Sequence, residues 1–163
     1  MAITREQVLA VLAGVRDPEV PVLSVIDLGI IRDVVIKDDR VEVKVTPTYS
    51  GCPALKVIEE NIVSALRDKG YPNSSVTTVY SPAWTTDWMS DEAKTKLRQY
   101  GIAPPQGNAP QDLVAISRPS KPIACPFCNS SQTKLQSQFG STACKAQYFC
   151  EGCHQPFEHF KAF

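Results

Sequence analysis

Helix-like and strand-like patterns of apolar residues alternate along the first part of the chain. Apolar side chains recur at every third or fourth position after Thr4, and this spacing predicts an amphipathic helix over about residues 5–15. Thr4 and Gln7 provide a capping-box start, whereas Asp17 precedes a proline, a position that is unfavourable for helix. We therefore expect the helix to end before Asp17.

A strand-like alternation follows this helix. Over residues 41–45, valines alternate with charged side chains, the pattern of a half-buried β-strand. The apolar stretch over residues 31–37 is suited to be its partner, with Asp38 and Asp39 in the turn between them. The pattern therefore predicts an antiparallel β-hairpin.

A second, longer helix is predicted to begin at Pro53, because the first helical position tolerates the missing N–H of proline. Lys69 and Gly70 suit its C-terminal end. A strand over residues 76–80 and a short polar helix over residues 90–99 follow. The apolar stripe of the longer helix consists of Leu55, Ile58, Ile62, Ala65 and Leu66.

The resulting element order, αββαβα, indicates an α+β fold with helices on one side of a small sheet. We assign these elements to a first domain over residues 1–102. Residues 103–122 are rich in proline and poor in large apolar side chains, which favours a semi-extended linker. Residues 123–163 then form a separate small module.

Four cysteines of this module form two Cys-x2-Cys pairs, Cys125 with Cys128 and Cys150 with Cys153. Each short turn directs two sulfurs toward one point, so two turns close a tetrahedral site without an open position, which is typical of structural zinc. A metal also stabilises a module that is too small to build a large core. We therefore expect a four-cysteine ribbon that binds Zn²⁺, with iron as the other metal that would suit four thiolates.

Cys144 is an alternative ligand within the ribbon. Its use in place of Cys150 would remove the short turn of the second pair, so we expect it outside the metal shell, either packed or facing a partner. His154 completes a string that is typical of c-type haem attachment, but that modification normally requires export and leaves the first cysteine pair unexplained. We expect His154 and His159 to be solvated or hydrogen-bonded. The expected ribbon core or docking edge consists of Phe157, Phe160 and Phe163.

Cys52 stands apart from the other cysteines. It directly precedes Pro53 and is expected at the N-cap of the second helix, where backbone N–H groups and the helix dipole lower the pKa of a thiol. With the hydroxyls of Thr46 and Thr48 nearby, Cys52 is a candidate to hold a metal or cluster transiently, or to act as a nucleophile. The simpler interpretation is a packed, unreactive side chain. Both histidines lie in the ribbon, which argues against a Cys–His hydrolase.

Acidic residues bracket a proline-containing loop before the hairpin. Asp17 and Glu19 lie at its start and Asp27 at its end. These carboxylates could assist metal binding or steer a partner. The simpler interpretation is turn chemistry, with Asp27 hydrogen-bonding the backbone before Gly29.

Composition narrows the functional classes. The 163 residues include 17 basic and 17 acidic side chains, and this balance gives no general field for nucleic acids. A thin stripe of Lys134, Lys145 and Lys161 beside the ribbon phenylalanines keeps nucleic-acid binding as a weaker alternative. The N-terminal residues do not resemble a secretory signal, and no apolar stretch is long enough to span a bilayer. We expect a cytoplasmic, reducing setting without membrane contact, where paired cysteines favour metal over disulfides.

Three short strings, Asp17-Pro-Glu, Asp27-Leu-Gly and Gly-Cys52-Pro, resemble the iron–sulfur assembly family long called domain of unknown function 59, over about residues 4–100. The resemblance implies a small αβ fold and a role in iron–sulfur protein maturation. Because one cysteine cannot supply all the usual cluster ligands, a cluster at this site implies a homodimer or ligands from another molecule. The site positions that the family implies are Cys52, Asp17, Asp27 and either Thr46 or Thr48.

Longer strings over residues 46–53, 87–89 and 139–146 resemble the D subunits of bacterial phenylacetyl-CoA epoxidases, over nearly the whole chain. This resemblance implies a place in phenylacetate degradation. The implied partners are the other epoxidase subunits, above all the reductase with its flavin and [2Fe–2S] cluster, and the iron–sulfur assembly machinery. The chain has neither the Glu-x2-His helices of a di-iron site nor a Gly-rich nucleotide loop. It is therefore expected to be an accessory, non-catalytic component.

Functions of different classes remain open at this point. The first is a maturation factor for the cluster of the reductase, with Cys52 active. The second is a structural or docking subunit, with Cys52 inert. The cluster content of the reductase in the absence of this chain distinguishes them, and salt-sensitive binding of DNA or RNA would favour the third, a nucleic-acid-binding ribbon.

Overall fold

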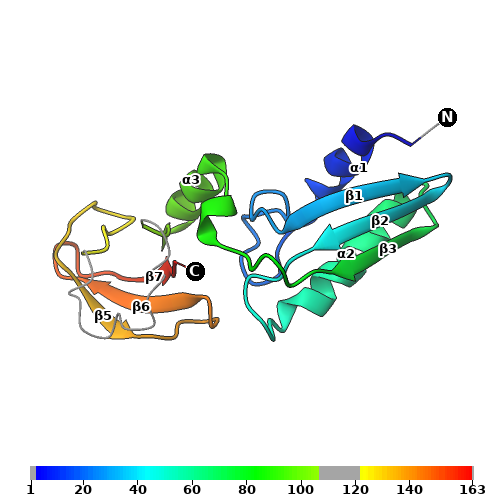
Figure 1. Cartoon of the computed structure of the whole chain (residues 1–163). Helices are drawn as coiled ribbons and strands as arrows, with labels where there is room; N and C mark the ends of the chain where they lie inside the picture. The colour runs from blue at the N-terminus through cyan, green and yellow to red at the C-terminus, as the bar shows by residue number, and fades with distance from the viewer. Residues whose placement is uncertain (1–2, 107–121, 163) are drawn as a thin grey trace. The chain divides into compact units, whose positions relative to one another are not determined.

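The computed structural model describes residues 3–106 and 122–162 (Figure 1), so most of the expected linker at 103–122 lies outside the described residues. The chain divides into two compact units. The first comprises residues 1–84 with 88–90, and the second comprises residues 85–87 with 91–163. A short 3-10 helix, η1 (Thr86–Trp88), lies where the chain passes from one unit to the other. No described helix has the length and apolar character needed to cross a membrane.

The first unit is a three-stranded sheet with two helices on one side (Figure 1). Strand β1 (Ile31–Lys37) pairs antiparallel with β2 (Arg40–Val45), and β2 pairs parallel with β3 (Ser74–Thr78). The predicted hairpin is therefore confirmed. Helices α1 (Arg5–Leu12) and α2 (Ala54–Asp68) contact each other and cover the sheet face that carries the buried valines of β2.

The two helices show how far periodicity defines helix bounds. The capping box at Thr4 is present, but α1 ends at Leu12, three residues earlier than predicted, because the chain turns at Gly14. Val15 is buried nonetheless, although it lies in the turn after the helix. In α2, the predicted positions Ile58, Ile62 and Leu66 are buried, whereas Leu55 and Ala65 are only half-buried. The helix ends as expected at Lys69 and Gly70, with Gly70 at a φ of 91°.

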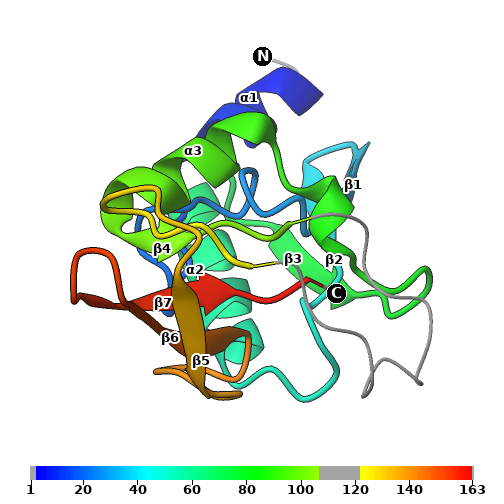
Figure 2. The same cartoon turned by 90° about the vertical axis from the view of Figure 1, so that its left-hand side faces the viewer.

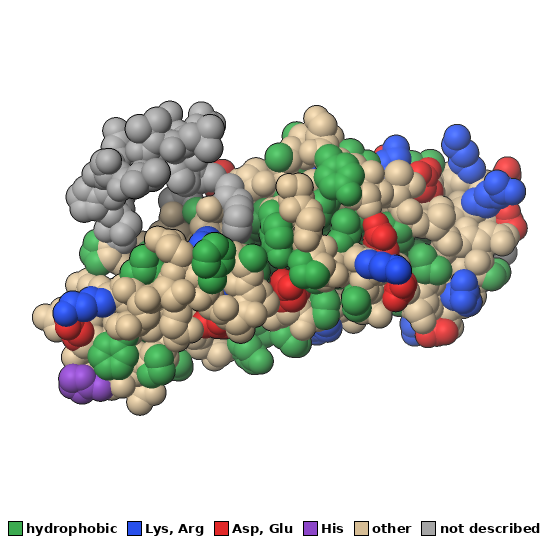
Figure 3. Space-filling model, turned by 90° about the horizontal axis from the view of Figure 1, so that it is seen from below, with side chains coloured by type: hydrophobic (Ala, Val, Ile, Leu, Met, Phe, Trp, Pro, Cys, Tyr) green, Lys and Arg blue, Asp and Glu red, His purple; other side chains and the backbone are tan. Residues whose placement is uncertain are grey.

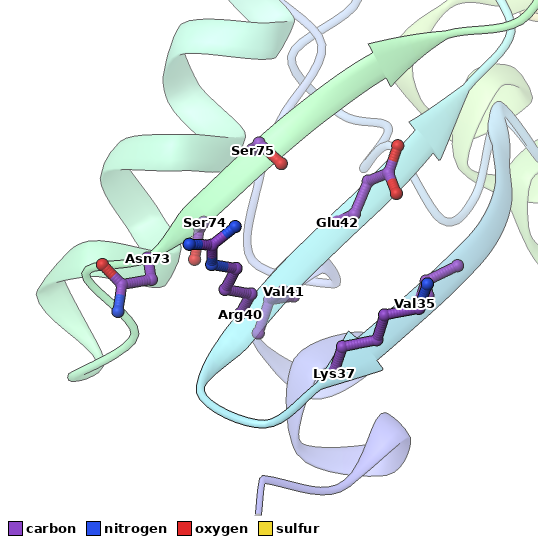
Figure 4. A pocket seen from close by; sticks show the side chains of 8 residues that line it. All are labelled: Val35, Lys37, Arg40, Val41, Glu42, Asn73, Ser74 and Ser75. Atoms are coloured by element: carbon purple, nitrogen blue, oxygen red, sulfur yellow. The ribbon is translucent and has the colours of Figure 1, made fainter.

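The other face of this sheet is open and polar. A shallow hollow of about 490 Å³ lies on it, and Figure 4 shows Lys37 and Arg40 at one end of the hollow and Glu42 and Ser75 farther along the strands. Glu42 accepts a hydrogen bond of 2.6 Å from the hydroxyl of Thr77. The α+β prediction with helices on one side of the sheet is thus confirmed.

A tryptophan-containing segment closes the first unit against the loop before β1. The indole N–H of Trp84 donates to the carbonyl of Leu28 at 2.8 Å, and the Arg32 guanidinium lies 3.7 Å from the centre of the Trp88 ring. Gly29 has a φ of +68°, and a Cβ atom there would lie 2.2 Å from the carbonyl oxygen of Trp88. Gly29 is therefore required for backbone conformation and for close approach.

Gly29→Ala should destabilise the first unit by about 3 kcal/mol or more, because alanine meets both the left-handed strain and the Trp88 backbone. Urea unfolding followed by tryptophan fluorescence would measure this change, since both tryptophans belong to this unit. Gly70→Ala is the matched control: its φ is +91°, but nothing lies within 4 Å of the added Cβ. That variant should lose only about 1–2 kcal/mol, and equal losses for the two variants would contradict the packing argument.

The second unit is a four-stranded sheet with one helix, α3 (Asp91–Tyr100). Its strand order is β4 (Ile102–Ala103), β7 (Pro156–Phe160), β6 (Lys145–Cys150), β5 (Thr133–Ser137). Strand β4 is parallel to β7, and the other pairs are antiparallel. Figure 2 shows α3 and β4 beside the ribbon strands. The sequence pattern favours hairpin strands over residues 132–139 and 143–149, which β5 and β6 confirm, but it indicates no strand at β4 or β7.

Helix α3 and β4 group with the ribbon, although the sequence analysis placed residues up to 102 in the first domain. Ile102 and Ala103 pair with Glu158 and His159 of β7. The ring Nδ1 of buried His159 also lies 3.2 Å from the Ala103 carbonyl, and burial lowers the pKa of this histidine. A neutral His159 that donates to Ala103 therefore holds β4 in the ribbon sheet. Phe157 and Phe160 are buried as predicted, and Phe163 lies outside the described residues.

Candidate functional site

Two tight turns in the second unit bring four cysteine sulfurs together. In the first turn, Cys125 accepts at its carbonyl from Asn129 and donates its N–H to Ser130, both at 2.9 Å. In the second, the Cys150 N–H donates to Gln155 at 2.9 Å. Asn129 and His154 follow the turns with positive φ, which reverses the chain. The sulfurs of Cys125, Cys128, Cys150 and Cys153 all lie within 4.8 Å of one another.

The sulfur distances fit a single metal ion. The Sγ atoms of Cys125 and Cys153 are 3.7 Å apart, and those of Cys128 and Cys150 are 3.6 Å apart. Tetrahedral coordination with metal–sulfur bonds of about 2.3 Å requires sulfur separations of about 3.8 Å. The pairs thus approach each other as ligands of one ion would, and the four cysteines form a cluster that could hold a metal ion.

The environment of the cluster shifts the pKa values of two of its thiols in opposite directions. The backbone N–H of Cys153 lowers the pKa of Cys150 to about 7, whereas burial and the neighbouring thiols raise the pKa of Cys153 to about 12. Metal binding must displace the remaining protons, so metal affinity is expected to rise with pH. Cys125 and Cys150 are buried in one core with Ala103, Ile123 and Phe157. The cluster is therefore built into the packing of the second unit.

Cys144 is buried but lies outside the group of four sulfurs. Its sulfur is 3.0 Å from the Thr142 hydroxyl, and its carbonyl accepts from the N–H of Lys161. A buried ion pair in the same region was not visible in the sequence: Lys145 Nζ lies 3.1 Å from Glu158, whose other carboxylate oxygen accepts from the Ser141 N–H. Cys144 thus belongs to a well-bonded loop between β5 and β6.

The position of Cys52 relative to the second helix differs from the prediction. Helix α2 begins at Ala54, with Pro53 at the N-cap position, so Cys52 lies one residue before the cap. Its thiol is half-buried and interacts with the backbone N–H of Ala54 and the side chain of Thr48. The carboxylates of Glu19 and Asp17 also act on it. The structure therefore brings Cys52 together with Thr48 and Asp17, as the sequence suggested.

The predicted low pKa of Cys52 is wrong. Burial raises the pKa of this thiol above its usual value, and the negative charges of Glu19 and Asp17 raise it further. The Ala54 N–H and Thr48 lower it, but by less. The helix N-terminus is visible in the sequence, whereas burial and the nearby carboxylates act on the thiol only in the folded unit.

Alkylation of Cys52 should therefore be slower at neutral pH than that of an unhindered thiol, because only the thiolate reacts. Its rate should rise with pH, with a midpoint above that of a free cysteine derivative. Glu19→Gln should move this midpoint downward by removing one facing negative charge. Iodoacetamide labelling with mass spectrometry across a pH series measures the profile, and a midpoint below that of free cysteine would contradict the structure.

The remaining predicted site residues have different surroundings. Asp17 accepts from the N–H groups of Glu19 and Val20 at 2.7 and 2.8 Å, so it also shapes its own loop. Asp27 accepts from the N–H and hydroxyl of Ser24 at 2.9 and 3.0 Å, as turn chemistry predicts. Thr46 follows β2 and is buried, and its hydroxyl has no hydrogen-bond partner within the described part of the chain.

Comparison with known proteins supports both units separately. Residues 5–80 match a family model described as "Iron-sulfur cluster assembly protein", and residues 109–161 match one described as "PaaD zinc beta ribbon domain". A solved structure of a domain of unknown function 59 from Bacillus anthracis superposes with a TM-score of 0.53 at 27% identity, covering 56% of this chain and 89% of that one.

Two curated relatives extend the comparison. An Fe-S protein maturation auxiliary factor of Porphyromonas gingivalis is 36% identical over 58% of this chain and 90% of its own. An Escherichia coli protein named "Putative 1,2-phenylacetyl-CoA epoxidase", the D subunit, is 42% identical over 95% of this chain and 91% of its own length. The chain, with its iron–sulfur assembly unit and its four-cysteine ribbon, belongs to the family of that epoxidase's D subunit.

Proposed function

We propose that this chain is a maturation factor that assists assembly of the [2Fe–2S] cluster in the reductase of a phenylacetyl-CoA epoxidase. The observation that carries the proposal is the Cys52 loop, placed within a unit that matches the iron–sulfur cluster assembly family. A role in iron–sulfur assembly agrees with the name of the Porphyromonas gingivalis relative, and the epoxidase is taken from the name of the Escherichia coli relative. The identity of the recipient, the reductase, goes beyond what these names state and is part of our proposal.

The charges around Cys52 favour cargo binding over nucleophilic attack. A half-buried thiol that faces Glu19 and Asp17 sits in a negative field, which disfavours a free thiolate. The same field attracts a cation, and bound iron would displace the thiol proton to solvent. Cys52 would be one ligand of the cargo, and the other ligands would come from the donor or the recipient. A single thiolate suits release as well as capture.

In the ribbon, we infer a structural Zn²⁺ held by Cys125, Cys128, Cys150 and Cys153. The short sulfur separations support a single ion, because a polynuclear cluster places several metal ions between its thiolates. Four thiolates leave no open position, so this site would have a folding role and no hydrolytic one. Its metal would remain in place while cargo passes through the Cys52 loop.

A docking subunit is the second candidate function. Phe127, in the first cysteine turn, is 58% exposed, and Phe139, in the β5–β6 loop, is 67% exposed. Exposed aromatic side chains on a well-packed module are typical anchors for another protein. In this function the ribbon would bind the oxygenase, and Cys52 would be inert.

Nucleic-acid binding is less well supported. Lys134 pairs with Glu151 at 2.5 Å and Lys145 with Glu158 at 3.1 Å, so two of the three ribbon lysines are neutralised. Lys161 donates to the Gln138 carbonyl and lies over the Phe139 ring. Figure 3 shows acidic and basic side chains interspersed on the face it presents, without an extended basic stripe.

Deleting this chain from a producing strain tests the proposal. The reductase would be purified from strains with and without it, and the [2Fe–2S] absorbance per flavin compared. A maturation factor predicts reductase with flavin but little cluster. Normal cluster content together with a dissociated epoxidase would favour the docking function instead.

A further inference from the structure

The two edges of the first sheet are built differently. Strand β1 has a bulge between Ile31 and Asp33, and Arg5 of α1 forms an ion pair of 3.4 Å with Asp33. Bulges and edge charges are common devices that prevent an edge from pairing with another strand. Strand β3, at the other edge in Figure 1, contains only serine, valine and threonine and keeps a regular register with β2. This edge has none of those protections.

The backbone of β3 presents a regular set of free groups at this edge. Val41 donates its N–H to the Asn73 carbonyl, and Val79 donates its N–H to Val45, so odd-numbered positions point toward β2. In a parallel pair, the alternate residues Ser74, Val76 and Thr78 then point their N–H and C=O groups outward. No strand among the described residues pairs with them.

A groove with an ordered charge pattern runs beside the free edge. It has a volume of about 420 Å³, and Val76 of β3 lines it together with residues of α2. Glu59 and Glu60 lie toward one end, Val63 and Ser64 in the middle and Arg67 toward the other end. Glu59 also accepts a hydrogen bond from the Thr78 hydroxyl. The groove is therefore acidic at one end and basic at the other, and small side chains line its middle.

We propose that β3 and α2 form an isologous interface with a second copy of this chain. In a twofold arrangement, β3 pairs antiparallel with its own copy around Val76, so Ser74 faces Thr78 of the copy and the outward groups meet as hydrogen-bonded pairs. The two α2 helices then run antiparallel on the same side of the joined sheet. Glu60 of one copy faces Arg67 of the other, around Val63 and Ser64.

This self-complementarity favours a second copy of the chain as the partner. The midpoint of the groove charges lies between Val63 and Ser64, and the midpoint of the strand is Val76. One twofold axis can therefore satisfy both the strand and the helix. A different partner would need basic side chains opposite Glu60 and acidic side chains opposite Arg67. A second copy of this chain, turned by the twofold axis, already presents that pattern.

This interface has a consequence for the cysteine loop and does not depend on the proposed function. Cys52 lies about a dozen residues before the twofold midpoint between Val63 and Ser64, so the two thiols of a dimer would be about 35 Å apart at opposite ends of the helix pair. They could not share one cluster. Remaining cargo ligands would have to come from the donor or the recipient.

Sedimentation velocity of the full, metal-loaded chain across a wide range of concentrations tests the interface. We expect concentration-dependent dimers. Arg67→Glu should weaken dimerisation at least about tenfold, because it places a negative charge against Glu60 of the other copy at both symmetry-related contacts. Glu60→Arg combined with Arg67→Glu should restore it. Lys37→Glu, on the open sheet face, is the matched charge reversal and should leave the dimer unchanged.

Hydrogen exchange provides a second readout. Amides in residues 74–78 should exchange more slowly as the concentration rises, because the outward N–H groups become paired. A chain that stays monomeric at every concentration would overturn the proposal and would leave the edge to a strand of another protein. A dimer that ignores Arg67→Glu would overturn it as well, because the copies would then meet elsewhere.

Discussion

Replacing Cys125 and Cys153 with serine is expected to release the ribbon metal and unfold the second unit while the first unit stays folded. Structural metal sites of this kind contribute about 10–16 kcal/mol of apparent binding energy, far more than a small core can replace. Cys125 is also completely buried against Ala103, Ile123 and Phe157, so its loss should extend to β4 as well as to the turns. Elemental analysis gives the metal content per chain.

Two further measurements make this prediction specific. Tryptophan fluorescence should be unchanged in the double variant, because Trp84 and Trp88 belong to the first unit. Cys144→Ser is the matched control: it replaces a buried ribbon cysteine outside the four-sulfur group and should keep the metal. A full equivalent of metal in the Cys125→Ser/Cys153→Ser protein would refute the ligand assignment, and iron in place of zinc would change the proposed role of the ribbon.

The second large effect is expected at Cys52. Cys52→Ser should leave the fold intact, because serine is similar in size and the thiol packs only half-buried beside Thr48. Reductase purified from cells with this variant should show the same cluster deficit as reductase from cells that lack the chain. Absorbance of the [2Fe–2S] cluster relative to flavin is the measurement, with epoxidase activity as the second readout.

Cys144→Ser again serves as the control and should give reductase with its normal cluster content. Normal cluster content and activity in the Cys52→Ser strain would end the maturation hypothesis. If the cluster is present but activity falls, Cys52 would have a role in the assembled epoxidase instead. If the ribbon variants prevent assembly of the epoxidase complex and Cys52→Ser does not, the docking function would be favoured.

The elements that local patterns determine were predictable. The β1–β2 hairpin follows from alternating valines, the buried face of α2 from helical spacing, and the cluster of four sulfurs from the two cysteine pairs. Strand β4 could not be found in this way, because two residues carry no periodicity and its partner β7 lies far along the chain, with Ile102 opposite Glu158. The same long-range pairing explains why α3 groups with the ribbon.

The Cys52 pKa shows a second limit. A helix start is visible in the sequence at Pro53, but the carboxylates of Glu19 and Asp17 reach the thiol only through the folded loop. Burial, the largest cause of the raised pKa, depends on the whole unit. The sequence thus identified the residue and its neighbours, whereas the sign of the pKa shift required the structure.

The pairing of β4 with β7 also bears on where the protein can be cut, extended or permuted. The chain leaves the ribbon sheet after β4 and returns to it at β5, so residues 107–121 connect parts of one unit. Lengthening such a connection costs only about 0.6 kcal/mol for each doubling, which makes it suitable for an inserted reporter or for new chain ends in a circular permutant. A fragment meant to isolate the ribbon should accordingly begin near residue 85, ahead of α3 and β4.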